Sequence, residues 1–104
     1  MGRWAQRTRA GGTVNNFNQM TEALVTDAPN GLVEVTYDNP VNGLLFNPNT
    51  FTVTGAPEQA IALTQLSANV IELEFPIDIT AETDLLYDGV VAGIITPQTI
   101  ALST

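Results

Sequence analysis

The side chains able to do acid–base chemistry in this sequence are almost all carboxylates. Its 104 residues include eleven Asp and Glu but no His, Cys or Lys, and the only serines are Ser67 and Ser103. Ser-His-Asp catalysis, Cys nucleophiles, Schiff-base lysines and metal sites built on His or Cys are therefore excluded. Carboxylate pairs of the glycosidase kind remain, but a short chain with short loops leaves little room for a substrate cleft. We expect no enzyme activity.

Three of the carboxylates, Asp78, Glu82 and Asp84, fall close together in one short segment. Hard cations such as Ca²⁺ take several oxygen ligands, which loops at one end of a β-sandwich can supply. These residues are weak candidates for a Ca²⁺ site. A solvated acidic loop is the favoured interpretation, because no EF-hand pattern accompanies them, and we expect no metal and no other cofactor.

Charge is divided sharply along the chain. All three basic residues, Arg3, Arg7 and Arg9, stand at the start, whereas the acidic residues run from Glu22 to Asp88, for a formal net charge of -8. The sequence therefore predicts a basic arm on an acidic body. Because no cation follows Arg9, the carboxylates of the body repel one another, and salt or a basic partner should stabilise it.

The first 18 residues are predicted to be arm and linker, with a hinge at Gly11-Gly12, and residues 19–104 a single domain. We expect Arg3, Trp4, Arg7 and Arg9 to bind a protein neighbour, through Arg–carboxylate pairs and insertion of Trp4 into an apolar pocket. Weak, salt-sensitive contact with nucleic acid and a tail without a role are the alternatives. The arm lacks the apolar core of a secretory signal, and no apolar run is long enough to span a membrane.

Strict alternation of apolar and polar residues predicts amphipathic strands in the body. A strand is preferred over a helical alternative at Ala23–Thr26, and Val90–Thr96 could hold one more. The other expected strands are at residues 33–37, 51–54, 61–64, 71–75, 85–87 and 100–102. Turn residues separate them at short intervals, so the fold predicted is an all-β antiparallel sandwich of about seven strands, with no long helix.

The aromatic residues at strand positions are predicted to be core: Tyr37, Phe51, Phe75 and Tyr87. One further apolar run, Leu44-Leu45-Phe46, lies between Gly43 and an Asn-Pro turn. It has two interpretations, a lid folded back onto the core or a contact surface for a partner. We include these three residues with the arm as candidates for partner binding.

Several runs together resemble bacterial Ig-like domains of the surface-repeat kind. They are GLVEVTYDNPV at 31–41, FTVT at 51–54, VIELEF at 70–75 and LLYDG at 85–89. The resemblance covers about residues 24–102 and implies an Ig-like sandwich with a binding or structural role. The arm, GRWAQRTRAGG at 2–12, resembles the start of small bacteriophage virion proteins, in which a short arm precedes a β-sandwich displayed on the particle.

These resemblances imply a non-enzymatic structural protein of a bacteriophage particle, either a minor capsid, a decoration or a spike-associated protein. Its N-terminal arm would anchor it to a neighbouring virion subunit or to another copy in a homo-oligomer, and it would be made in the host cytoplasm and located in the virion. The alternative is an Ig-like binding module for cell-surface adhesion or Ca²⁺-dependent glycan binding.

Overall fold

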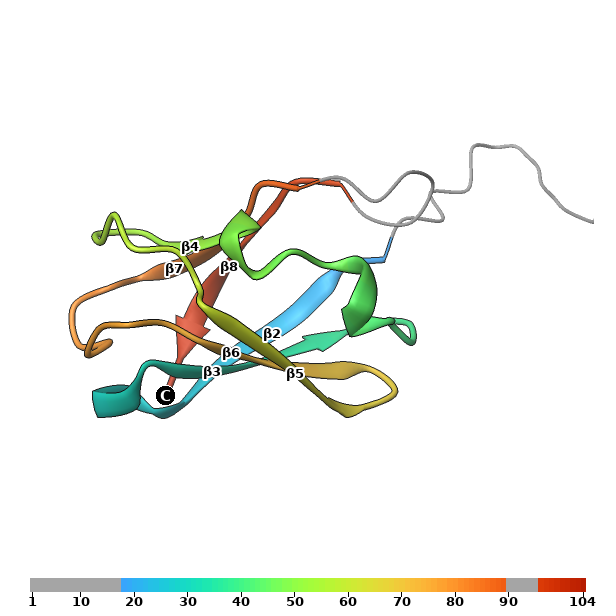
Figure 1. Cartoon of the computed structure of the whole chain (residues 1–104), viewed down its shortest axis with the longest axis horizontal. Helices are drawn as coiled ribbons and strands as arrows, with labels where there is room; N and C mark the ends of the chain where they lie inside the picture. The colour runs from blue at the N-terminus through green and yellow to red at the C-terminus, as the bar shows by residue number, and fades with distance from the viewer. Residues whose placement is uncertain (1–17, 90–95) are drawn as a thin grey trace, which may run out of the picture.

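A computed structural model describes residues 18–89 and 96–104, and this part of the chain is all-β (Figure 1). The strands are β2 Met20–Asp27, β3 Leu32–Tyr37, β4 Phe51–Val53, β5 Ala62–Ser67, β6 Val70–Glu74, β7 Asp84–Tyr87 and β8 Gln98–Ser103. Three short 3-10 turns connect them, at η1 Ala28–Asn30, η2 Gly43–Leu45 and η3 Pro48–Thr50. Across the described ranges no helix is long and apolar enough to cross a membrane.

The strands form one seven-stranded sheet in the order β4-β7-β8-β2-β3-β6-β5. Every neighbouring pair is antiparallel except β2 and β8, which run parallel and pair only at Ala23 with Leu102 and Leu24 with Ser103. This short contact joins a four-stranded half to a three-stranded half. The sheet curls at the junction, so that the strands of the two halves lie across from each other (Figure 1).

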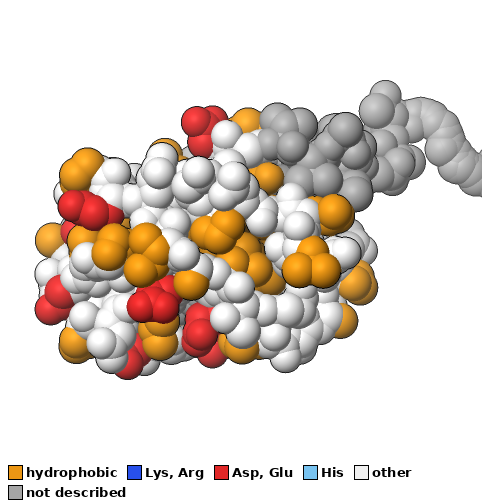
Figure 2. All heavy atoms as spheres, in the orientation of Figure 1, with side chains coloured by type: hydrophobic (Ala, Val, Ile, Leu, Met, Phe, Trp, Pro, Cys, Tyr) orange, Lys and Arg blue, Asp and Glu red, His pale blue; other side chains and the backbone are white. Residues whose placement is uncertain are grey.

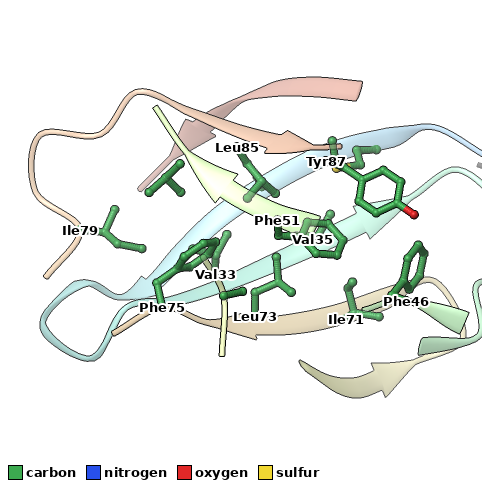
Figure 3. Packing of buried hydrophobic residues seen from close by; sticks show 14 of the residues in the cluster. Val33, Val35, Phe46, Phe51, Ile71, Leu73, Phe75, Ile79, Leu85 and Tyr87 are labelled. Carbon is green, nitrogen blue, oxygen red and sulfur yellow. The ribbon is translucent and has the colours of Figure 1, made fainter. Parts of the chain in front are cut away.

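The core fills the space between the two halves. Val33 and Val35 of β3 are fully buried, while Glu34 between them points to the other face, as the period of two requires. Figure 3 shows side chains from both halves converging on one cluster. Its largest fully buried members are Phe51, Phe75, Ile71, Leu73, Leu85, Val33, Val35 and Val53. Burying each such side chain contributes about 1.5–3 kcal/mol, so this cluster is the main source of stability.

Most expected strands are confirmed within one or two residues, and so is the burial of Tyr37, Phe51, Phe75 and Tyr87. The helical alternative is wrong over its described part, because β2 runs from Met20 to Asp27 and covers the whole of Ala23–Thr26. Two register shifts interrupt the pairing of β2 with β3 and hide its alternation in the sequence. The strand considered at Val90–Thr96 lies almost wholly outside the described residues.

The expectation of purely antiparallel pairing is wrong at one position in the sheet. The first and last described strands, β2 and β8, run in the same direction, and the curl of the sheet brings them side by side. The all-β class is therefore correct, and the sheet is mixed.

Gly31 makes the turn between β2 and β3 possible. It ends η1 in the left-handed conformation, at φ 70°, and its carbonyl accepts a hydrogen bond from the Phe75 amide at 2.9 Å. A Cβ at this position would lie 2.1 Å from the carbonyl oxygen of Phe75 and 2.7 Å from that of Ile77. Only glycine fits, because both obstacles are backbone atoms.

Gly31→Ala is predicted to lower the free energy of unfolding by about 2–5 kcal/mol, since backbone strain and steric overlap add. Gly55 is the matched control, because it also has a positive φ, of 105°, but a Cβ there would meet nothing closer than 3.9 Å. Gly55→Ala should cost about 1–2 kcal/mol from strain alone. Urea unfolding of the two variants measures the difference, and equal losses would contradict this account of Gly31.

Candidate interaction surface

The residues predicted to bind a partner fall into two groups in the structure. Arg3, Trp4, Arg7 and Arg9 lie outside the described residues. The other group, Leu44-Leu45-Phe46, is described. Leu44 and Leu45 belong to η2, and Phe46 is the residue that follows it. The structure therefore bears on the second group alone.

The path of η2 is fixed by polar bonds made with backbone amides. The Asn42 side chain accepts a hydrogen bond from the Leu44 amide at 3.0 Å, which caps the turn. The Gly43 amide donates to Oε1 of Gln65 on β5 at 2.6 Å. A Cβ on Gly43 would lie 2.9 Å from both this oxygen and Cδ2 of Leu63, so glycine allows the turn to approach β5 closely.

The Leu44-Leu45-Phe46 run is divided between the core and the solvent. Phe46 is buried and its ring lies 5.8 Å from that of Tyr37 in a stacked pair. It also meets the edge of Tyr87 at 5.6 Å between centroids. Leu44 and Leu45 are instead exposed. Phe46 thus belongs to the core as a lid, whereas its two neighbours face solvent.

Beside η2 the surface is hollowed into a groove of about 480 Å³. The groove lies between the η2–η3 connection and the inner face of β5. Its walls are mostly apolar, with two amide side chains among them. The lining residues are Asn42, Gly43, Leu44, Phe46, Pro48, Leu63 and Gln65. Its size and lining can accommodate a large apolar side chain or a small ligand.

Four large apolar side chains are exposed on the described part of the chain, and all belong to η2, β5 or the residue before β5. They are Leu44 at 93% exposure, Ile61 at 61%, Leu45 at 49% and Leu66 at 46%. Figure 2 shows apolar side chains spread over the middle of the face on which β5 and η2 lie. Together with the groove they form the candidate interaction surface.

Sequence analysis missed Ile61 and Leu66 as members of this surface. The alternation in Ile61-Ala62-Leu63-Thr64 predicts Ile61 and Leu63 on the buried face, and Leu63 does pack against the core. Ile61, however, precedes the strand and is exposed, and a register shift between Gln65 and Ser67 interrupts the pairing of β5 with β6 near Leu66. Because a strand at the end of a sheet has a neighbouring strand on one side only, alternation alone does not determine which of its side chains are buried.

The opposite face of the four-stranded half is acidic. Glu34 on β3 pairs directly with Glu72 on β6, and Glu74 follows two residues later on the same face. Residues 10–104 contain no Lys, Arg or His, so no cation of the described chain can offset this repulsion. Like charges directly opposite one another on a sheet destabilise it.

Glu72→Lys is predicted to raise the free energy of unfolding by about 0.5–1 kcal/mol at low salt, because it turns the repulsion with Glu34 into attraction. The gain should shrink when the screening length falls to about 3 Å in 1 M salt. Urea unfolding at both salt concentrations tests this. The control is Glu58→Lys at an exposed loop position, which makes the same change in net charge. If Glu58→Lys raised the free energy of unfolding by as much, the gain would come from the change in net charge and not from the pair of Glu34 with residue 72.

Tyr37 carries a buried polar atom without a partner. Its hydroxyl makes no hydrogen bond within the part of the chain that the structure describes. Burial, with a smaller contribution from the nearby Tyr87, raises the pKa of the Tyr37 phenol well above its usual range. Burial also raises the pKa of Tyr87. Both phenols are therefore held neutral in the folded chain.

Tyr37→Phe is predicted to stabilise the chain by about 1 kcal/mol near pH 7, because it removes an unsatisfied buried hydroxyl. In the parent, the folded state holds the phenol proton more tightly than the unfolded state. Its free energy of unfolding should therefore fall as pH rises through about 10, and the variant should lose less.

Urea unfolding at neutral and alkaline pH measures both effects. Tyr87→Phe is the control, since Tyr37 alone has an unpartnered buried hydroxyl among the described residues. Equal behaviour of the two variants would contradict the role given to the Tyr37 hydroxyl.

The weak Ca²⁺ candidates are not assembled into a site. No three acidic side chains of the described ranges are grouped so that they could hold a metal ion. Glu82 instead accepts hydrogen bonds from the amides of Thr80, at 3.0 Å, and Ala81, at 3.2 Å. Asp84 accepts one from the Thr83 hydroxyl at 3.3 Å. These carboxylates order their own loop.

Comparisons with models of protein families, with curated proteins and with solved structures find no match to this chain.

Proposed function

We propose that the fold is an Ig-like sandwich of the constant type. Such domains have seven strands, A to G in chain order, arranged as A-B-E-D in one sheet and C-F-G in the other. The seven described strands in chain order, β2 to β8, follow the same arrangement, with β2-β3-β6-β5 in one half and β4-β7-β8 in the other. The antibody-type disulfide is missing, since the chain has no Cys. The buried cluster between the halves stabilises the domain in its place.

An Ig-like fold specifies no activity, so function has to be argued from the surface. We propose that the chain is a non-enzymatic structural protein of a bacteriophage particle, anchored to a neighbouring subunit by its N-terminal arm. The observation that carries the proposal is the separation of charge, with every cation between Arg3 and Arg9 and every anion between Glu22 and Asp88.

The surface of the body supports a role in assembly. The exposed side chains Leu44, Leu45, Ile61 and Leu66 are suited to burial against another chain, and the acidic outer face of β3 and β6 suits a basic partner. The carboxylates Asp38 and Glu82, in contrast, accept hydrogen bonds from the backbone amides of Gln19 and Thr80. That arrangement supports a structural use of these groups over acid–base work.

Arg7→Glu is predicted to reduce the number of copies of the chain on purified particles at least tenfold, because it reverses the central charge of the arm. The melting temperature of the isolated chain should stay unchanged. Quantitative mass spectrometry of particles from cells infected with the variant phage gives the copy number. Arg7→Lys is the control at the same position, because it keeps the positive charge of the arm. Normal occupancy of the Arg7→Glu chain would overturn the proposed anchor.

The second candidate is a binding module that uses the body alone. The groove beside η2 favours it, since its apolar walls carry the amides of Asn42 and Gln65, which could orient a small ligand or a glycan. This function predicts ligand binding that is indifferent to Arg7→Glu and lost on Leu44→Asp. A glycan array probed with the parent and both variants separates it from the assembly role.

A further inference from the structure

β5 is an open edge strand. It ends the sheet, and nothing in the described residues pairs with its outer side. The other end, β4, is only three residues long and is bridged by Gln59 opposite Thr52. Edge strands are usually protected by charges, Lys or Pro, but β5 reads ALTQLS and has none of them. Such an edge can accept another strand.

The two sides of this edge differ in chemistry. On the inner side lies the groove formed by Leu44, Phe46 and Leu63. On the outer side, the neighbouring strand β6 presents Glu72 and Glu74. A strand added to β5 would therefore need apolar side chains toward one face and basic side chains toward the other.

The arm has this pattern. Arg3, Arg7 and Arg9 are all at odd positions, whereas Trp4 is at an even one. Since successive side chains of an extended strand point to opposite faces, the three arginines and Ala5 fall on one face, and Trp4 falls on the other with the uncharged Gln6 and Thr8. No other segment of the chain carries a cation at all.

We propose that residues 3–9 of one copy bind β5 of a second copy as an additional strand. Trp4 enters the groove beside Leu44 and Phe46. The arginines lie over the acidic face, about 10 Å from the backbone of β6, where extended Arg and Glu side chains meet. Backbone bonds would supply affinity, and the two faces would supply specificity. This inference rests on the proposed function, in which the arm is the anchor, and adds the identity of its receptor.

A second copy is the better donor for a geometric reason. Asn18 lies at the end of the sheet where Tyr37 and Ser67 also lie, since its side chain bonds the Asn39 carbonyl at 2.9 Å and Val70 pairs with both Thr36 and Ser67. An arm reaching β5 of its own body from that end would run parallel to it. An arm from another copy can run antiparallel, which is the more stable pairing.

Each copy then donates one arm and offers one edge. The contact joins different surfaces on the two partners, so it repeats head to tail and builds rings or filaments. Regular spacing on a particle would add to its strength, because each further contact forms within one assembly.

A complementation experiment with full chains tests this inference. The arm-defective chain carries Trp4→Ala and Arg7→Glu, and the edge-defective chain carries Leu44→Lys and Leu66→Lys. A control chain places the same two charges on β8, at the exposed positions Thr99 and Ala101. Light scattering over a range of concentrations gives the mass of each sample, and thermal unfolding checks that every variant is folded.

We expect the parent and the control chain to self-associate as the concentration rises. Each defective chain alone should self-associate at least tenfold more weakly. A mixture of the two defective chains should form a one-to-one dimer and stop there, because only one intact arm and one intact edge can meet. High salt should weaken this dimer. A monomeric mixture of folded chains would overturn the inference, and so would a parent that stays monomeric throughout.

The two proposals fail in different ways. If the parent does not associate with itself but Arg7→Glu still removes the chain from particles, the anchor is correct and its receptor is another protein. If the parent associates as expected but Arg7→Glu chains occupy particles normally, the edge contact is real and the particle role is wrong.

Discussion

The structure depends on the burial of one apolar cluster between the two halves of a curled sheet. Val33 and Val35 from β3 and Ile71 and Leu73 from β6 meet Phe51 and its neighbours from the other half, and all five are completely buried. Because strand side chains alternate, fixing these residues inward fixes the acidic residues outward. The curl that closes the cluster also gives the sheet two ends, and only the end at β4 is covered within the described chain. The alternation that buries the core therefore also places the acidic residues on the outer face, and the curl that closes the core leaves β5 at an open edge of the described sheet.

Among the described residues, stability comes from burial and backbone bonding, because residues 18–104 supply no cation for an ion pair. Eleven carboxylates share residues 22–88 with no cation, and Glu34 faces Glu72 directly. For stability in isolation this repulsion between Glu34 and Glu72 is unfavourable, since replacing one of the two glutamates by Lys would remove it. In the proposed contact the same charges would be favourable, because carboxylates that repel one another within one copy would attract the basic arm of another.

Most strands could be predicted from the sequence because their alternation directly reflects a buried and a solvated face. The clearest were Val33–Tyr37 and Ile71–Phe75, where alternation is unbroken. What could not be predicted depends on contacts between distant segments. The start of β2 is obscured by register shifts, and the parallel pairing of β2 with β8 arises only when the sheet curls. In the candidate site the run at 44–46 was found, but its division into a buried Phe46 and an exposed Leu44 depends on contacts with distant segments, such as the packing of Phe46 against Tyr37 and Tyr87.

The attachment of Asn18 to the body has a mechanical consequence. Its side chain bonds the carbonyl of Asn39, its own carbonyl accepts from Nε2 of Gln98 at 2.6 Å, and Oε1 of Gln98 in turn accepts from the Met20 amide at 2.7 Å. Force applied to the chain ahead of Asn18 is therefore transmitted along the axis of β2. The pairs that β2 makes with β3 then carry the load together in shear, and the sheet does not unzip one bond at a time.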